Sequence, residues 1–236
     1  MNTPLSWIKA YVPELTCTEQ EYMDAMTMSG TKVEGYEKFD ADLDKIIVGK
    51  IEKIEKHPDA DKLVVCQVAI DEEGTTTQIV TGASNVKEGQ KVPVVLDGGR
   101  VAGGHDGKKV AGGVKIKKGK LRGVESNGMM CSIEELGSST DFYPDAAEDG
   151  IYILSDNPEY KDAPVGSDAI ALLGLRDADF EYEVTSNRVD CFGVLGIARE
   201  AAATFRKPFV PPVVTESGND EKTEDYLSLI HISEPT

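Results

Sequence analysis

The sequence predicts an α+β protein in which a strand-rich middle segment lies between two flanks of mixed structure. Two observations predict this class. From about Asp44 to residue 130, β-branched runs such as KLVVCQVAID alternate with turn residues. No helix follows each strand in turn, which argues against a doubly wound sheet. The middle segment is therefore best explained as a small closed or partly open β-barrel.

The first flank, residues 1–36, is expected to contain two short helices and a strand. In LSWIKAYVPEL, Leu5, Ile8 and Val12 recur at helical spacing, and a proline follows. Thr18 and Glu21 have the spacing of a capping box and predict the start of a second helix, EQEYMDAMTMSG, which Gly30 can end. TKVEGYE then reads as a strand.

The middle segment contains five or six short strands in about ninety residues. The runs are KIIVGKIEKIEK, KLVVCQVAID, TTTQIVTGAS, QKVPVVLDGG, VKIKKGKLRG and ESNGMMCS. Glycine is frequent between residues 98 and 128, as expected for tight turns and bulges. The stretch SIEELG predicts a short helix at the end of the segment.

The second flank is acidic at first and then helical. GIYIL and FEYEV read as strands, and a short helix that Ser167 can cap lies between them. CFGVLGIAREAAATFRKP predicts an amphipathic helix with Leu195, Ala198, Ala202 and Phe205 on one face. Asn187 or Asp190 can cap its N-terminus.

Composition limits the classes of function. The formal net charge of −17 disfavours nucleic-acid binding unless positive charge is gathered locally. The four cysteines show no zinc-ligand spacing and predict reduced thiols in a cytoplasmic protein. No apolar run approaches the length needed to cross a membrane.

The stretch HPDADKL, residues 57–63, allows three interpretations. It holds one of only three histidines, with Asp59, Asp61 and Lys62. A metal site or an acid/base pair would need partners that the sequence does not offer at a diagnostic spacing. A turn between two strands is favoured, with Pro58 fixing φ and the aspartates accepting backbone amides.

A basic window covers residues 108–122. It contains seven of the 25 lysine and arginine residues and none of the 42 acidic residues. This pattern favours a surface for polyanions over a merely solvated edge strand. Because the window has no aromatic side chain, phosphate or shape contacts are expected rather than base stacking. The basic residues are Lys108, Lys109, Lys115, Lys117, Lys118, Lys120 and Arg122.

Two further motifs are ambiguous. In ESNGMMCS, Ser126 and Asn127 can bond a ligand or cap the bend, Gly128 can supply a turn or bulge, and Met130 is expected in the core. In SNRVDC, Cys191 invites a nucleophile reading, but no histidine lies near in sequence, so a buried structural thiol is favoured.

Several stretches together resemble the beta subunit of bacterial phenylalanine–tRNA ligase. SWIKAYV is similar to its first helix. HPDADKL, IVTGASNV, GQKVPVVL and KIKKGKLRGVESNGMMCS resemble, in order, its inserted tRNA-binding domain, and NRVDCFGVLGIAREAAA resembles the start of the next domain. HPDADKL and SNGM also occur in free-standing tRNA-binding proteins. The family often has proline where Val189 stands, and the tail LIHISEPT departs from its pattern.

The resemblance implies a fold and a role. It implies an OB-fold barrel (residues 40–150) inserted into a small discontinuous α/β domain (residues 1–39 and 151–200). Residues 201–236 would be a truncated start of an editing-type domain with a non-native tail. It implies tRNA contacts from Lys62, Asn85, Ser126, Asn127 and the basic window, with no catalytic or metal-binding residue in this chain.

The partners implied are tRNA and a catalytic alpha subunit in an (αβ)₂ assembly, with no DNA and no membrane. The complete enzyme would be an aminoacyl-tRNA ligase that uses ATP and magnesium, while this chain carries no cofactor of its own. Two alternatives stay open: a module that docks on other parts of the synthetase without touching RNA, favoured by the net charge of −17, and a free-standing tRNA-binding protein.

Overall fold

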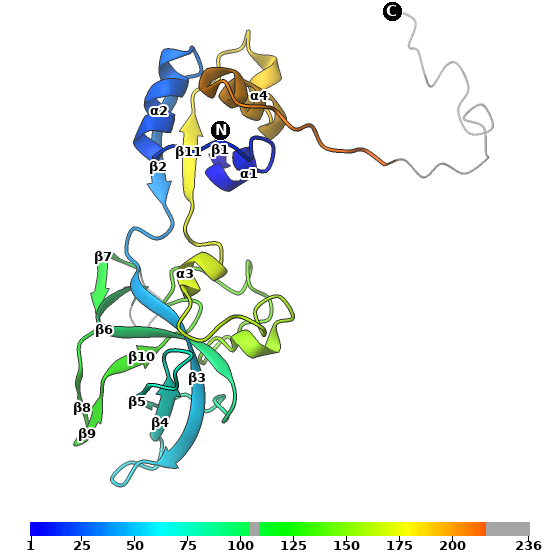
Figure 1. The fold of residues 1–236 in the computed structure, drawn as a ribbon. Helices are drawn as coiled ribbons and strands as arrows, with labels where there is room; N and C mark the ends of the chain where they lie inside the picture. The colour runs from blue at the N-terminus through cyan, green and yellow to red at the C-terminus, as the bar shows by residue number, and fades with distance from the viewer. Residues whose placement is uncertain (104–108, 216–236) are drawn as a thin grey trace, which may run out of the picture.

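The computed structural model of the 236-residue chain describes residues 1–103 and 109–215. Figure 1 shows two groups of elements, each built around its own sheet, and two segments of chain that connect them. The order of strands is β1-β11-β2 in one sheet and β10-β6-β3-β4-β5 in the other, with β7 paired to β6. The predicted mixed class is confirmed, and the pairs within these sheets are antiparallel.

The three-stranded sheet joins the two flanks of the sequence. Strand β11 (Ala178–Tyr182) pairs with β1 (Asn2–Pro4) on one side and with β2 (Val33–Lys38) on the other. Helices α1 (Leu5–Lys9), α2 (Glu19–Met28) and α4 (Val194–Phe205) gather around it. Segments more than 170 residues apart, such as Thr3 and Phe180, are therefore direct neighbours.

The predicted first flank is largely confirmed. Thr18 and Glu21 form the capping box at the start of α2, and Gly30 has a φ of +106° just beyond its end. Helix α1 is shorter than the LSWIKAYV pattern suggested, although Leu5, Ile8 and Val12 are all buried as expected. Their core also contains Tyr22 and Tyr182, whose hydroxyl groups are hydrogen-bonded at 2.9 Å.

Helix α4 is present but is capped and oriented differently from the prediction. Its N-cap is Gly193, without a side-chain bond, while Asn187 and Asp190 lie upstream, Asp190 within the 3₁₀ turn η2 (Val189–Cys191). Ala198 and Ala202 are buried as predicted, but Leu195 is 37% exposed. The buried stripe is completed by Ile197 and Ala201.

The six-stranded sheet confirms the strand-rich middle. Its centre is formed by two long strands, β3 (Asp44–Lys56) and β6 (Lys91–Gly103), whose pairing contains a register shift. The shorter strands are β4 (Val64–Ala69), β5 (Thr76–Thr81), β7 (Lys109–Lys115) and β10 (Gly128–Met130). Strands β8 (Gly119–Leu121) and β9 (Val124–Ser126) form a separate hairpin.

The six-stranded sheet is buried on both faces. Val94 and Val95 are adjacent and fully buried, yet they belong to different apolar clusters, because successive side chains of a strand point to opposite faces. The cluster on the Val94 face also contains Cys66, Ile79 and Met130. The cluster on the Val95 face contains apolar residues from the segment 131–175, including two from the short helix α3 (Ala169–Leu172).

Three local predictions in this region are wrong. SIEELG forms a hydrogen-bonded turn instead of a helix, with Ser132 and Glu135 bonded reciprocally. GIYIL is not a strand but leads into a 3₁₀ turn, η1 (Leu154–Asp156). Helix α3 is capped by Asp168, whereas the neighbouring Ser167 hydroxyl donates to the Pro164 carbonyl. Among the described residues, no helix has the length and apolar character to cross a membrane.

Candidate nucleic-acid interface

The loop of residues 57–63 connects β3 to β4 and is closed by its own hydrogen bonds. The His57 amide donates to the Leu63 carbonyl at 3.2 Å, and the Leu63 amide donates to the Ala60 carbonyl at 3.2 Å. The Asp59 amide donates to Nδ1 of His57 at 3.1 Å. The predicted turn is therefore confirmed, but the side chain that accepts a backbone amide in it is the His57 ring, whereas the sequence favoured the aspartate carboxylates.

His57 also reaches outside its loop. It is 6% exposed, and its Nε2 lies 3.0 Å from the carbonyl oxygen of Leu121, in the β8–β9 hairpin. These two residues are separated by 64 positions in the sequence. The hydrogen bond brings the conspicuous HPDADKL stretch against the end of the basic window, a contact that no spacing rule could have indicated.

The hairpin turns at Arg122 and Gly123, both of which have positive φ, at 45° and 89°. Two successive residues with positive φ are the signature of a type I′ turn, which favours Asn-Gly. Arginine is an unusual choice there, because a left-handed conformation costs an ordinary L-residue roughly 1–2 kcal/mol. The turn holds the Arg122 side chain exposed at the tip of the hairpin.

The described basic side chains of the window are exposed. Lys115 ends β7, Lys117 and Lys118 follow it, and Lys120 lies in β8. Lys62 is exposed in the neighbouring loop. Lys108 and the side chain of Lys109 lie outside the described part of the structure. Arg100, which is half-buried, lies opposite Lys115 on β6 and adds a basic neighbour from outside the sequence window.

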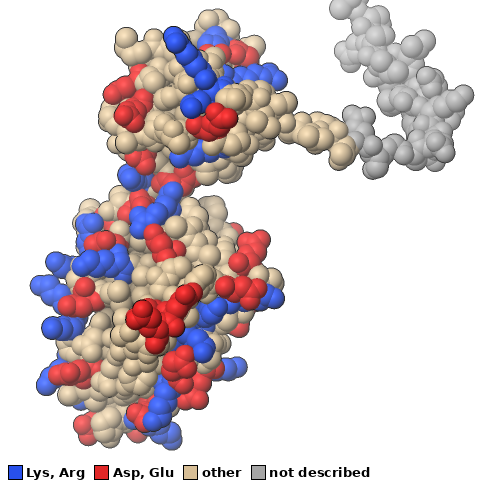
Figure 2. Space-filling model, viewed as in Figure 1, with Lys and Arg blue, Asp and Glu red and all other residues tan. Residues whose placement is uncertain are grey.

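The window is free of acids in sequence but not in space. Glu125 lies opposite Lys120 across the hairpin, with 3.9 Å between Nζ and Oε1. The Asp97 carboxylate accepts the Lys118 backbone amide at 2.8 Å. Figure 2 accordingly shows lysine and arginine along the edge where β7, β8 and β9 lie, with acidic side chains among them. The local field is therefore weaker than the sequence suggested.

Two of the predicted polar contacts have structural partners. The Asn85 side chain donates to the Ile151 carbonyl at 2.8 Å and accepts from the Ile151 amide at 3.1 Å. Ser126 is buried, and its hydroxyl accepts from the Val80 amide and donates to the Gly128 carbonyl. Asn127 is half-buried, and its backbone amide donates to Gln78. The side-chain amide of Asn127 makes no hydrogen bond to any described residue.

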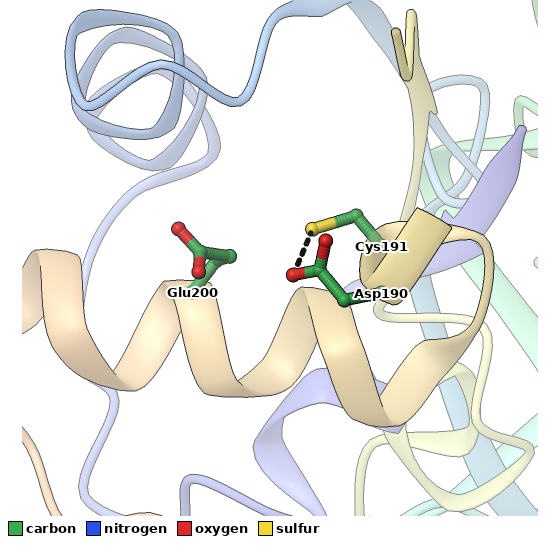
Figure 3. A group of neighbouring side chains, drawn as sticks. All are labelled: Asp190, Cys191 and Glu200. Carbon is green, nitrogen blue, oxygen red and sulfur yellow. Dashed lines mark hydrogen bonds between the residues drawn. The ribbon is translucent and has the colours of Figure 1, made fainter. Parts of the chain in front are cut away.

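A second polar cluster lies beside α4. Figure 3 shows Asp190, Cys191 and Glu200, whose candidate ligand atoms lie within 4.8 Å of one another. The Arg188 guanidinium lies 2.9 Å from Asp190, 2.8 Å from Glu200 and 3.0 Å from the Cys191 sulfur. Its hydrogen bonds lower the pKa of Asp190 to about 2. Burial, and next the hydrogen bond to Asp190, raise the pKa of Cys191 to about 11.

This cluster does not fit magnesium or a cysteine nucleophile. Magnesium prefers six oxygen ligands, whereas here the positive charge among the two carboxylates is already supplied by Arg188. A thiol whose pKa is raised stays protonated and is a poor nucleophile at neutral pH. The predicted burial of Cys191 is confirmed, and Arg188 pairs with Asp190 and Glu200.

Comparisons with known proteins agree with the motifs. Residues 46–151 match the protein family described as "Putative tRNA binding domain". Over 212 residues the chain is 45% identical to the phenylalanine–tRNA ligase beta subunit of Clostridium tetani, which covers 90% of this chain. It is 40% identical over 239 residues to the beta subunit of Listeria innocua, which covers all of it. The similarity to these subunits that the motifs indicated is thus confirmed.

The coverage of the relatives is partial. The chain spans 24% of the length of the Clostridium tetani subunit and 27% of the Listeria innocua subunit. Among solved structures, a MetRS related protein from Pyrococcus horikoshii is 25% identical, with 53% of this chain and 87% of that chain covered and a TM-score of 0.32.

Proposed function

We propose that this chain is the N-terminal part of a phenylalanine–tRNA ligase beta subunit and that it contributes tRNA binding and assembly to the enzyme. The single observation that carries the proposal is the match of residues 46–151 to a tRNA-binding family within a chain similar to such subunits over 90% or more of its length. The whole enzyme would attach phenylalanine to its tRNA in the cytoplasm with ATP and magnesium. Its alpha subunit would complete an (αβ)₂ assembly.

The role proposed for this chain is accessory rather than catalytic. Its one described cluster of potential metal ligands is neutralised by Arg188, and its cysteine is protonated. The chain would therefore bind and orient the tRNA through side chains outside the catalytic centre.

The proposed architecture is an OB-fold barrel inserted into a discontinuous domain. The order β10-β6-β3-β4-β5, with both faces of the sheet buried, supports a curled, nearly closed sheet. The pairing of β1 and β2 with β11 supports a domain made from both flanks. Tyr152, Ile170 and Leu175 pack on the six-stranded sheet. We therefore propose that the barrel domain ends near residue 177, rather than at residue 150 as the resemblance implied.

The proposed tRNA surface consists of Lys62, Lys115, Lys117, Lys118, Lys120 and Arg122, with Lys108 and Lys109 expected to extend it. Their charges are exposed and gathered on β7, the hairpin and the adjoining loop. Asn85 and Ser126 are assigned to the support of this surface, because their polar groups bond the protein itself. Asn127 keeps a free side-chain amide within the described structure and stays a candidate contact.

The test is a charge reversal of Lys115, Lys117, Lys118 and Lys120 to Glu. Each lost phosphate contact should reduce the slope of log affinity against log salt by about 0.7–0.9, so the variant should bind tRNA more weakly and with a flatter salt dependence. The matched control reverses Lys9, Lys38, Arg206 and Lys207, which lie on or near the three-stranded sheet. Equal affinity of both variants at low salt in a gel-shift titration would contradict the proposal.

One observation favours a docking role as a second candidate. Phe192, Val189 and Trp7 are more than half exposed near the three-stranded sheet, and such apolar side chains suit a protein partner. Co-purification of this chain with the alpha subunit, together with no affinity for tRNA, would decide for docking. A free-standing tRNA-binding protein is the weakest candidate, because the beta-subunit similarity extends far beyond residues 46–151.

A further inference from the structure

We propose that His57 is a positioning residue that holds the β8–β9 hairpin against the loop of residues 57–63. Through this link, Lys120 and Arg122 of the hairpin and Lys62 of the loop present one surface to the tRNA backbone. The inference rests on the proposed tRNA-binding function and names the residue that organises the surface. His57 itself is 6% exposed, so it acts through its neighbours rather than by touching RNA.

The partners of the ring determine its tautomer. A backbone amide can only donate, so the Asp59 amide at 3.1 Å requires a lone pair on Nδ1 of His57. The proton of the neutral ring then lies on Nε2, which donates to the Leu121 carbonyl at 3.0 Å. Both nitrogens are thus used, one within the loop and one across to the hairpin.

The bond from His57 holds the tip of the hairpin, whereas the base is held by other hydrogen bonds. At its base, Gln78 of β5 donates to the Glu125 carbonyl at 2.7 Å and accepts from the Asn127 amide at 2.8 Å. Among the described residues, the bond from His57 is the one hydrogen bond that joins residues 121–124 to another element. A two-stranded hairpin is marginally stable alone, so the loss of this bond would let its tip move about the base.

The bond couples two charged segments that are far apart in sequence. Leu121, which accepts it, lies between Lys120 and Arg122. Lys62 lies in the loop that His57 and Leu63 close. If the two segments moved freely relative to each other, that motion would have to be lost when RNA binds, at a cost in affinity. A fixed distance between the segments avoids this cost, so the phosphate contacts of both can add to the affinity.

Two amide substitutions separate the two bonds of the ring. His57→Gln can place its side-chain NH₂ near the position of Nε2 and keep the donation to Leu121. His57→Asn can place its oxygen near the position of Nδ1 and keep the bond from Asp59. If His57 only closed its own loop, His57→Asn would keep its function. If His57 positions the hairpin, His57→Gln keeps the function and His57→Asn does not.

The experiment measures tRNA affinity by fluorescence anisotropy and amide hydrogen exchange in residues 119–126, in the chain as it stands. We expect His57→Gln to behave like the wild type and His57→Asn to bind about three- to tenfold more weakly, the loss expected for one hydrogen bond. Hairpin amides should exchange faster in His57→Asn while those of β3 and β6 stay protected.

The outcomes are distinguishable from failure of the proposed function. Unchanged hairpin exchange in His57→Asn, or equal effects of both substitutions, would overturn the role of His57. Loss of protection throughout the sheet would overturn it too, because His57 would then support the whole fold. If instead Lys120→Glu and Arg122→Glu bind tRNA like the wild type, the binding surface is wrong, while hydrogen exchange still tests the link.

Discussion

Replacement of Arg122 by asparagine should move stability and tRNA binding in opposite directions. Arg122 has a φ of 45° in a turn that is best served by Asn-Gly, and Gly123 already occupies the second position. The left-handed conformation costs an arginine roughly 1–2 kcal/mol, and asparagine tolerates it better. Arg122→Asn should therefore raise the free energy of unfolding by about 0.5–1 kcal/mol, because part of this strain is relieved. The Tm should rise by about 1–4 °C.

The same substitution removes a proposed phosphate contact. The slope of log affinity against log salt should become shallower by about 0.7–0.9. Urea denaturation and a salt series of tRNA titrations measure the two effects. Arg122→Lys is the conservative control, since it keeps both the charge and the strained backbone and should change neither quantity much.

Arg206→Asn is the matched control for the strain argument. Arg206 has a φ of 53° at the end of α4, in the other sheet's group of elements. Its replacement should stabilise the chain by a similar or smaller amount, because a cation at a helix C-terminus is itself favourable, and should leave the salt slope unchanged. If Arg122→Asn lowered the free energy of unfolding, the argument from backbone strain would be refuted. If it kept the full slope of log affinity against log salt, the proposed phosphate contact of Arg122 would be refuted.

Three further predictions concern stability, pH and thiol reactivity. Gly128→Ala should lower the free energy of unfolding by about 1–3 kcal/mol in urea titrations, because its Cβ would lie 2.6 Å from the Val95 carbonyl oxygen; no change would mean that β10 can shift freely. The pKa of Asp190 is lowered to about 2 by its hydrogen bond to Arg188, so the stabilisation from this pair is fully present above the unfolded pKa near 4 and is lost as pH falls through 2. Arg188→Leu should remove that part of the dependence of the unfolding free energy on pH. If the plots of unfolding free energy against pH were parallel for the variant and the wild type, the prediction would be wrong. Native-state labelling at pH 8 should modify Cys17 before the other three cysteines, which are buried, and simultaneous labelling would show that the cores open.

Local patterns predicted the elements well where one physical effect dominates. The capping box at Thr18 and Glu21 satisfies backbone amides within four residues, so no distant contact is needed to form it. The β-branched runs of the middle segment became strands because both faces of their sheet are buried.

The errors occur where local preference is nearly balanced. Asn187, Asp190 and Gly193 could each precede α4, and the helix begins after the last of them. GIYIL has the composition of a strand, but the amide and the carbonyl of Ile151 are hydrogen-bonded to the Asn85 side chain, 66 residues away, instead of to a neighbouring strand.

The sequence by itself determined the class of the protein: the mixed fold, the strand-rich middle, the basic window and the beta-subunit resemblance all follow from patterns within short segments. Only the tertiary structure decided what the conspicuous polar residues do. It set the His57 ring against Leu121, used Asn85 to hold Ile151, and brought Glu125 next to Lys120. Such contacts depend on long-range packing and on which strands become neighbours, and the chemistry of a single segment does not contain that information.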